Sequence, residues 1–241
     1  MTKSLRVLLL QVRNAGDPMR EHEARSFVKQ TGLLSEQLVT WDAVERSPSL
    51  AEVQAYDALM VGGSGEYFVS KQNQPGLESL GQLLRDVAGA GHPTFASCYG
   101  FQCMVLAYGG EIVHDPENTE VGTYAMRLTE AGRQDPLLGQ LPASFPAQQG
   151  HKDRASKLPD GFENLASSDG VALQALRVPG QPIWGVQFHP ELDHLANRHR
   201  YEHYLDAYST HMTPEERAEA LSRFTPTPEA SSLLGRFLEM L

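Results

Sequence analysis

The chain has 241 residues, of which 41% are hydrophobic and 21% charged, as is ordinary for a globular protein with one substantial core. Its 20 lysine and arginine residues against 30 aspartate and glutamate residues give a formal net charge of −10, which argues against nucleic acid as a partner. Only two cysteines are present and no apolar run is long enough to cross a bilayer, so we expect neither a disulfide framework, structural zinc nor a membrane span. We expect a cytoplasmic protein.

The first half of the chain alternates between strand-like apolar runs and segments with helical spacing. Nearly continuous apolar runs are typical of buried parallel strands, and strands separated by helices predict a parallel sheet with right-handed crossovers. In chain order the expected elements are a strand at Arg6–Val12, a helix at Glu21–Thr31, strands at Leu38–Trp41 and Tyr56–Val61, a helix at Leu77–Ala90 and a strand at Thr94–Ser97.

Residues 111 to 184 carry shorter β-like pieces between turn residues, which predicts hairpins added to the sheet. The clearest of these pieces are Tyr124–Leu128, Ala172–Leu176 and the start of Ile183–Phe188.

After Glu191 the chain becomes helical, with one helix expected over Leu192–Tyr208. A second begins at Thr213, where Thr-Pro-Glu-Glu supplies an N-cap, a proline at the first position and a capping box. A third helix is expected to open at Thr227 and to run to the C-terminus. We predict one domain over residues 1–191 and a helical extension over 192–241 packed on it. The apolar residues of the extension could instead make a homodimer or partner contact.

Cys98 lies between a predicted strand and a predicted helix, in Phe-Ala-Ser-Cys-Tyr-Gly-Phe-Gln. Small residues around a sharp strand-to-helix turn are the layout of a nucleophile elbow. A helix N-terminus also favours the thiolate. An inert buried thiol is the alternative reading of this segment.

An apolar strand ends in His189-Pro190-Glu191. A cysteine nucleophile needs an imidazole to exchange its proton, and the imidazole needs a carboxylate to fix its orientation. The proline holds His189 and Glu191 on one rigid segment. The pattern predicts a Cys98–His189–Glu191 triad.

These segments resemble the class I, triad-type glutamine amidotransferase family. The signature Gln-Phe-His-Pro-Glu is complete at residues 187–191, and Cys98-Tyr99-Gly100 resembles the elbow of the GMP synthetase branch. Gly62-Gly63, Gly109-Gly110 and Glu120-Val121-Gly122 follow in the expected order, so the resemblance covers residues 5 to 191. It departs at Ala96, where the family has glycine, and at Phe101, beside the glutamine position.

The resemblance implies a flavodoxin-like, doubly wound α/β fold with a mainly parallel sheet and helices on both faces. It implies that Cys98 attacks the γ-amide of L-glutamine, that His189 carries the protons, and that glutamate and ammonia are released without a cofactor or a metal. The backbone N–H groups of Gly63 and Tyr99 would form the oxyanion hole. The implied substrate contacts are Gln102, Gly62, Gly122, the Thr123 backbone and His151.

The ammonia would pass to an ATP-dependent synthetase on another chain, since this chain has no such module. Two alternatives stay open. The first is hydrolysis of γ-glutamyl peptides or γ-glutamyl amines by the same triad, and the second is a non-catalytic regulatory module. The segment His199-Arg200-Tyr201-Glu202-His203 also matches a zinc-peptidase pattern, but a charged, solvated helix is the better reading.

Overall fold

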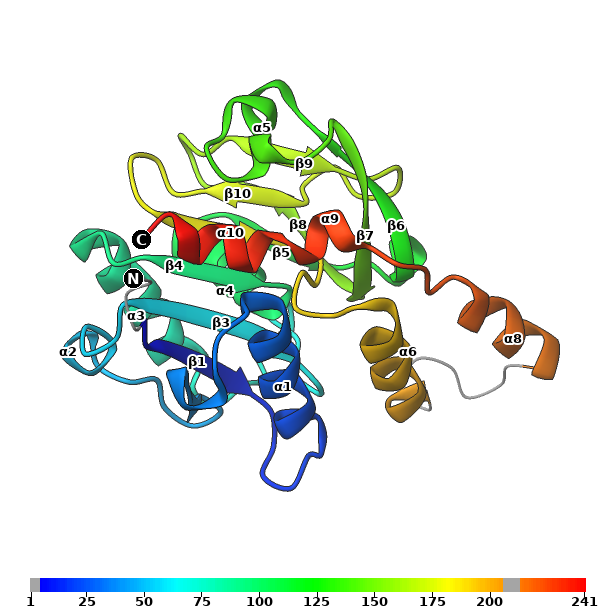
Figure 1. Ribbon diagram of the computed structural model, residues 1–241, viewed down its shortest axis with the longest axis horizontal. Helices are drawn as coiled ribbons and strands as arrows, with labels where there is room; N and C mark the ends of the chain where they lie inside the picture. Colours follow the sequence, from blue (N-terminus) through cyan, green and yellow to red (C-terminus); the bar gives the residue numbers. More distant parts are fainter. Residues whose placement is uncertain (1–4, 206–212) are drawn as a thin grey trace.

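The computed structural model describes residues 5–205 and 213–241, and within them the chain forms a nine-stranded sheet in the order β2-β1-β3-β4-β11-β10-β9-β6-β7 (Figure 1). The first five strands are parallel and the other four join them as antiparallel neighbours. The parallel strands are β2 (Leu38–Asp42), β1 (Val7–Val12), β3 (Ala58–Ser64), β4 (Thr94–Ser97) and β11 (Ile183–Val186). The antiparallel strands are β10 (Ala175–Arg177), β9 (Asn164–Ser167), β6 (Glu120–Leu128) and β7 (Ser144–His151).

The order of the parallel strands is that of a flavodoxin-like sheet, in which ligands bind outside the carboxyl ends of the strands. The expected fold class is therefore confirmed. The antiparallel additions are also present, together with a separate ribbon of β5 (Glu111–His114) and β8 (Asp153–Lys157).

The two faces of the sheet are covered by different helices, as the alternation of side chains along β1 requires. Val7 and Leu9 belong to the core beneath α1 (Met19–Thr31) and α10 (Leu233–Glu239). Leu8 and Leu10 belong to the opposite core, beneath α3 (Leu77–Ala90) and α4 (Tyr99–Ala107). Burial on both faces explains why these strands are nearly continuous apolar runs.

The remaining helices are short or lie at the edge of the molecule. They are α2 (Leu50–Val53), α5 (Glu130–Gln134), α6 (His194–His203), α8 (Pro214–Ser222) and α9 (Pro228–Ser231), with 3-10 turns at Ser35–Gln37, Pro116–Asn118 and Leu138–Gln140. Helix α8 has no buried residue and stands away from the sheet in Figure 1. Among the described residues, no helix has the length and apolar character needed to cross a membrane.

The helices predicted to begin at Thr213 and Thr227 do begin there, but the one from Thr227 is divided at Ser232 into α9 and α10, and the one before them is shorter than predicted. Thr213 accepts a hydrogen bond from the N–H of Glu216 in the expected capping box. The helix expected over Leu192–Tyr208 is found over His194–His203, and its later start follows from Asp193, which caps the N-terminus by accepting from the N–H of Ala196. The last residues of that expectation, 206–208, lie outside the described residues.

Candidate active site

Cys98 occupies the sharp turn between β4 and α4. Its backbone has φ 48° and ψ −103°, and a non-glycine residue pays roughly 1–3 kcal/mol for such a conformation. Its N–H donates to the carbonyl of Val186 on the adjacent strand, at 2.8 Å. A methyl group on Gly100 would lie 2.7 Å from the carbonyl oxygen of Val61, so only glycine fits there. The turn predicted from the small residues is therefore present, and its strain is located at the thiol.

His189 and Glu191 form a buried pair at the end of β11. The His189 Nδ1 and the Glu191 Oε1 are 2.6 Å apart, and both side chains are fully buried. Because the carboxylate accepts, Nδ1 carries the proton, and the other ring nitrogen, Nε2, remains for proton exchange. That Nε2 is buried without a hydrogen-bond partner in the described part of the chain. The unpaired nitrogen is available to a thiol, a leaving group or a water.

The charges at this end of the sheet favour an imidazolium. Burial alone would lower the pKa of His189, but the thiolate of Cys98 and the carboxylate of Glu191 outweigh burial and raise this pKa to about 9. Burial would likewise raise the pKa of Glu191, yet His189 and Arg200 hold it below its ordinary value. The three groups can therefore hold a thiolate, an imidazolium and a carboxylate in sequence, which is the charge state that a cysteine nucleophile requires.

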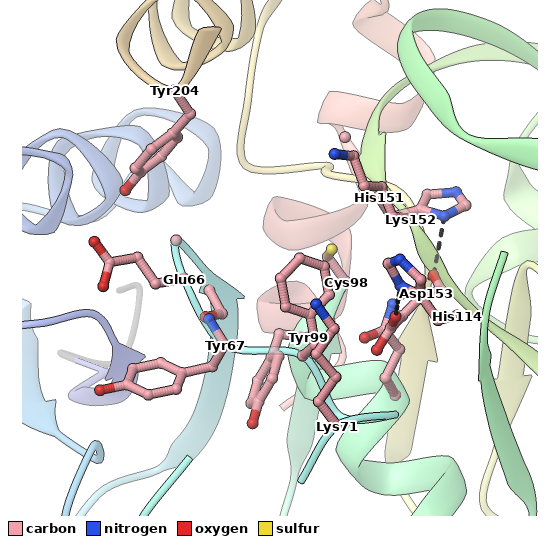
Figure 2. Close-up of a pocket in the computed structure, with 15 residues that line it drawn as sticks. Glu66, Tyr67, Lys71, Cys98, Tyr99, His114, His151, Lys152, Asp153 and Tyr204 are labelled. Carbon is pink, nitrogen blue, oxygen red and sulfur yellow. Dashed lines mark hydrogen bonds and ion pairs between the residues drawn. The ribbon is translucent and has the colours of Figure 1, made fainter. Parts of the chain in front are cut away.

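Cys98 opens into a pocket with a volume of about 430 Å³. Figure 2 shows Cys98 and Tyr99 near its centre, with Tyr204, Glu66 and Tyr67 on one side and His114, His151, Lys152 and Asp153 on the other. Both acidic and basic groups line the pocket, as a substrate with an ammonium and a carboxylate would need. The pocket lies at the carboxyl ends of the parallel strands, where this fold class binds ligands.

Gln102 lines this pocket, one helical turn after Cys98. Its amide Nε2 donates to the carbonyl of Asp153 at 2.8 Å and to Gln187 Oε1 at 3.1 Å. Gln187 in turn directs its own Nε2 to the Cys98 sulfur, at 3.7 Å. Gln187 thus connects the signature segment, residues 187–191, to the thiol of Cys98 through a hydrogen bond. The sequence pointed to this residue only as part of the signature and assigned it no role.

The two backbone groups expected to form the oxyanion hole differ in their surroundings. Tyr99 is the first residue of α4, so its N–H has no acceptor within the helix. The N–H of Gly63 donates instead to the carboxylate of Glu23, at 3.2 Å. Gly62 is pressed against the same carboxylate, since a methyl group on it would lie 2.8 Å from Glu23 Oε1. In this conformation the N–H of Tyr99 has no acceptor within its helix, whereas the N–H of Gly63 is occupied by Glu23.

Gly122 and Thr123 do not line the pocket, and the geometry does not support the substrate contacts expected of them. The Thr123 N–H donates to the carbonyl of Arg223, at 2.9 Å, and its hydroxyl donates to the carbonyl of Thr225. The C-terminal extension therefore covers this stretch of β6. The neighbouring strand β7 approaches the site instead, because a methyl group on Gly150 would lie 3.7 Å from His189 Nε2.

His151 borders the pocket, but both of its ring nitrogens have internal partners. Its Nδ1 is 3.0 Å from the Asp153 carbonyl oxygen and its Nε2 is 3.1 Å from the buried carboxylate of Glu120. The carboxylate of Asp153 accepts from the N–H and hydroxyl of Ser70. The His-x-Asp segment therefore holds the wall of the pocket together, a role that residue type alone could not distinguish from substrate binding.

The zinc-peptidase pattern does not assemble a metal site. Within the described residues, no group of three or more His, Cys, Asp or Glu side chains is placed to hold a metal ion. The ring of His199 lies against that of His22, with ring centroids 5.1 Å apart. The residue between the two pattern histidines that does reach the site is Arg200, whose guanidinium lies 3.4 Å from His189 Nδ1. No sequence signal marked it.

Comparison with known families matches residues 16–204 to the class-I glutamine amidotransferase family model. The chain is 31% identical over 173 residues to a subunit of the glutamine-hydrolysing GMP synthase of Methanocaldococcus jannaschii, covering 72% of this chain and 83% of that one. It is also 31% identical over 187 residues to the glutamine-hydrolysing GMP synthase of Mycobacterium marinum, covering 75% of this chain but only 33% of that longer protein.

Solved structures share the fold over nearly the whole chain. A glutamine amidotransferase from Thermotoga maritima aligns with a TM-score of 0.71 and 19% identity, covering 98% of this chain and 97% of that one. A glutamine amidotransferase from Methylobacillus flagellatus aligns with a TM-score of 0.66 and 19% identity, covering 97% of this chain and 91% of that one. At these identities the structural likeness concerns the fold.

Proposed function

Because this chain belongs to the class-I glutamine amidotransferase family, and is a glutamine amidotransferase, we propose that it hydrolyses the γ-amide of L-glutamine with Cys98, His189 and Glu191. The observation that carries the proposal is the buried His189–Glu191 pair, 2.6 Å apart, whose imidazolium is stabilised by the thiolate of the strained Cys98. Burying an ion pair requires that its charges lose their hydration, and a strained backbone also costs free energy. Both features together, beside a thiol in a pocket, indicate a functional site rather than a contribution to packing.

The reaction follows from these groups. The Cys98 sulfur attacks the γ-carbonyl carbon, the C–N bond breaks, and His189 gives its proton to the departing ammonia. A water then attacks the thioester while His189 accepts its proton, and the C–S bond breaks to release glutamate and restore the pair of Cys98 thiolate and His189 imidazolium. Glu191 keeps the proton on Nδ1 throughout, so that Nε2 is the nitrogen that exchanges protons.

For the oxyanion of each tetrahedral intermediate, we propose the N–H groups of Tyr99 and Gly63. The position of Tyr99 at the start of α4 supports its role directly. Gly63 can serve only after its N–H has exchanged Glu23 for the oxyanion. For the glutamyl end of the substrate, Gln102 and the Gly150–Lys152 segment are the supported contacts, because they line the pocket beside Cys98.

We propose that the ammonia is used by an ATP-dependent synthetase on another chain. The relative from Methanocaldococcus jannaschii is named as one subunit of a glutamine-hydrolysing synthase, which supports a separate partner. A purification of the tagged chain from its source cell should therefore recover a synthetase chain with it. Recovery of the tagged chain alone under mild salt would contradict this part of the proposal.

The pocket also favours a second candidate, hydrolysis of a γ-glutamyl peptide or amine. Its volume of about 430 Å³ lies within the range of pockets that hold drug-sized ligands, which are larger than glutamine, so a longer γ-glutamyl compound fits the same space. Turnover of glutamine and of γ-glutamyl dipeptides by the isolated chain separates the two candidates. A higher kcat/KM for the dipeptides would favour the second.

Labelling of Cys98 tests the nucleophile itself. A glutamine-like electrophile should modify Cys98 rapidly, and the variant C98S should lose hydrolysis while C103S keeps it. Cys103 is a matched control because it is buried within α4, the helix that follows Cys98, and burial raises the pKa of its thiol. Absence of labelling in the wild-type chain would favour a non-catalytic regulatory module.

A further inference from the structure

Arg200 brings a buried positive charge to the His189–Glu191 pair. It lies on α6, is 6% exposed, and its two terminal nitrogens reach different parts of the site. Nη1 is 3.4 Å from His189 Nδ1, and Nη2 donates to the carbonyl of Ser64 at the end of β3, also at 3.4 Å. Because Nδ1 already donates its proton to Glu191, the contact with Nη1 joins two donors and acts through charge rather than as a hydrogen bond.

Arg200 forms no ion pair with a carboxylate among the described residues. No carboxylate of the described residues lies within 4.0 Å of its guanidinium nitrogens. Glu191 is fully buried, its Oε2 has no hydrogen-bond partner among the described residues, and the positive charge of Arg200 helps to hold its pKa below the ordinary value. A buried carboxylate with one unsatisfied oxygen is costly to keep ionised, so a nearby cation contributes directly to its charge state.

The other groups around Arg200 do not cancel this charge. On α1, burial, followed by His199 and Arg200, lowers the pKa of His22 to about 4, so its ring is neutral near pH 7. Arg13 and Glu23 form their own buried ion pair at 3.1 Å. The groups that remain therefore lie in the order Cys98, His189, Glu191 and Arg200, so that the carboxylate of Glu191 has a cationic partner on each side when His189 is protonated.

We infer that Arg200 is a positioning residue of this site, which closes the row of alternating charges, keeps Glu191 ionised and favours the neutral form of His189 once Cys98 is acylated. The inference rests on the proposed function. Before attack, the thiolate balances the imidazolium. In the thioester that negative charge is gone, yet Glu191 still stabilises the imidazolium, while the second step needs a neutral His189 to accept a proton from water. At that stage the positive charge of Arg200 destabilises the imidazolium that Glu191 stabilises.

The direct test is the titration of His189 by NMR in the full chain carrying C98S, which imitates the loss of the thiolate. Protein labelled with ¹⁵N-histidine gives the ring signals, and H189Q identifies the one that belongs to His189. We expect R200M to raise the titration midpoint by about one pH unit or more relative to R200K, which keeps the charge. R200Q replaces R200M if the latter does not fold. Equal midpoints for the charged and uncharged variants would overturn the inference.

The kinetic test uses the chain with Cys98 intact. The acid limb of the pH profile of kcat for glutamine should move to higher pH in R200M and stay near the wild-type position in R200K. A side chain that only fills space would leave the limb unchanged. If the NMR midpoint shifts but neither wild-type nor variant protein turns over glutamine or γ-glutamyl compounds, the proposed function fails while the electrostatic role of Arg200 stands.

Discussion

Gly63 donates its backbone N–H to the side chain of Glu23, with 3.2 Å between the nitrogen and Oε1. The carboxylate is buried and is held in place by Arg13 at 3.1 Å and by the amide of Gln11 at 3.0 Å. A residue of α1 thus occupies the N–H that we propose for the oxyanion. Under the proposed mechanism, the reacting oxygen must replace Glu23 at this N–H in every turnover.

Weakening this contact should increase partner-independent turnover. An amide oxygen is a weaker acceptor than a carboxylate, so E23Q should release the Gly63 N–H more often and raise the glutaminase kcat of the isolated chain about three- to tenfold. The assay should be run where unfolding curves show both proteins fully folded, because E23Q also breaks the buried pair with Arg13. E21Q, on the exposed side of the same helix, serves as the control. An unchanged or lower kcat would show that this contact does not limit turnover.

Glu191 should contribute to stability in a pH-dependent way. Its pKa in the folded chain is held below the ordinary value, so its contribution is complete above about pH 4.5 and is lost as the pH falls through the folded-state pKa. The difference in unfolding free energy between wild type and E191Q should therefore shrink as the pH falls below about 4.5. Urea denaturation at a series of pH values measures this difference. A constant difference would contradict the assigned direction.

Replacement of His151 should mainly affect stability. H151A removes the imidazole 3.1 Å from the buried carboxylate of Glu120, which keeps its bonds from Ser168 and Gln174, so we expect the loss of one buried hydrogen bond at a cost of about 1–3 kcal/mol. H199A, at an exposed position of α6, should cost less than about 1 kcal/mol. Urea unfolding of the two variants provides the comparison. A fully stable H151A with a raised KM for glutamine would point to a direct substrate contact instead.

Gly122 should be more sensitive to substitution than its backbone conformation alone explains. Gly122 and Gly161 both have positive φ, at 106° and 82°, so alanine is strained at either position. Only at Gly122 would the added methyl meet another segment, 2.9 Å from the Cβ of Arg223. We expect G122A to lower the unfolding free energy by at least about 1 kcal/mol more than G161A and to expose the Arg223 region to limited proteolysis. Equal losses of unfolding free energy in the two variants would mean that the segment around Arg223 moves aside at little cost.

We propose that residues 192–241 are part of the same folding unit as residues 1–191. Phe237 is fully buried against Phe95 and Trp184, with ring centroids 5.7 and 6.0 Å away. F237A should therefore cost about 3–5 kcal/mol in a single cooperative unfolding transition. The control M240A removes a side chain that is 42% exposed and should cost little. A first transition that involves only the extension would contradict the single unit.

The sequence by itself determined the features that depend on local patterns. Apolar runs predicted the buried strands, because a parallel strand covered on both faces has no polar side to reveal. Small residues on both sides of Cys98 predicted its sharp turn, because larger ones would collide with the neighbouring strand, as the 2.7 Å approach at Gly100 shows. The complete Gln-Phe-His-Pro-Glu signature identified the family, which the match over residues 16–204 confirms.

Only the tertiary structure decided which groups are free to act. Glu23 is 40 positions from the Gly63 N–H that it occupies, and Arg200 is 136 positions from the Ser64 carbonyl that it reaches. Thr123 faces the extension 100 residues later rather than the pocket, through its bond to Arg223. Hydrogen bonds and fields act over a few ångströms in space and have no fixed spacing along the chain. Cys98 could therefore be found by reading the sequence, whereas the charges and carbonyls that control its partners could not.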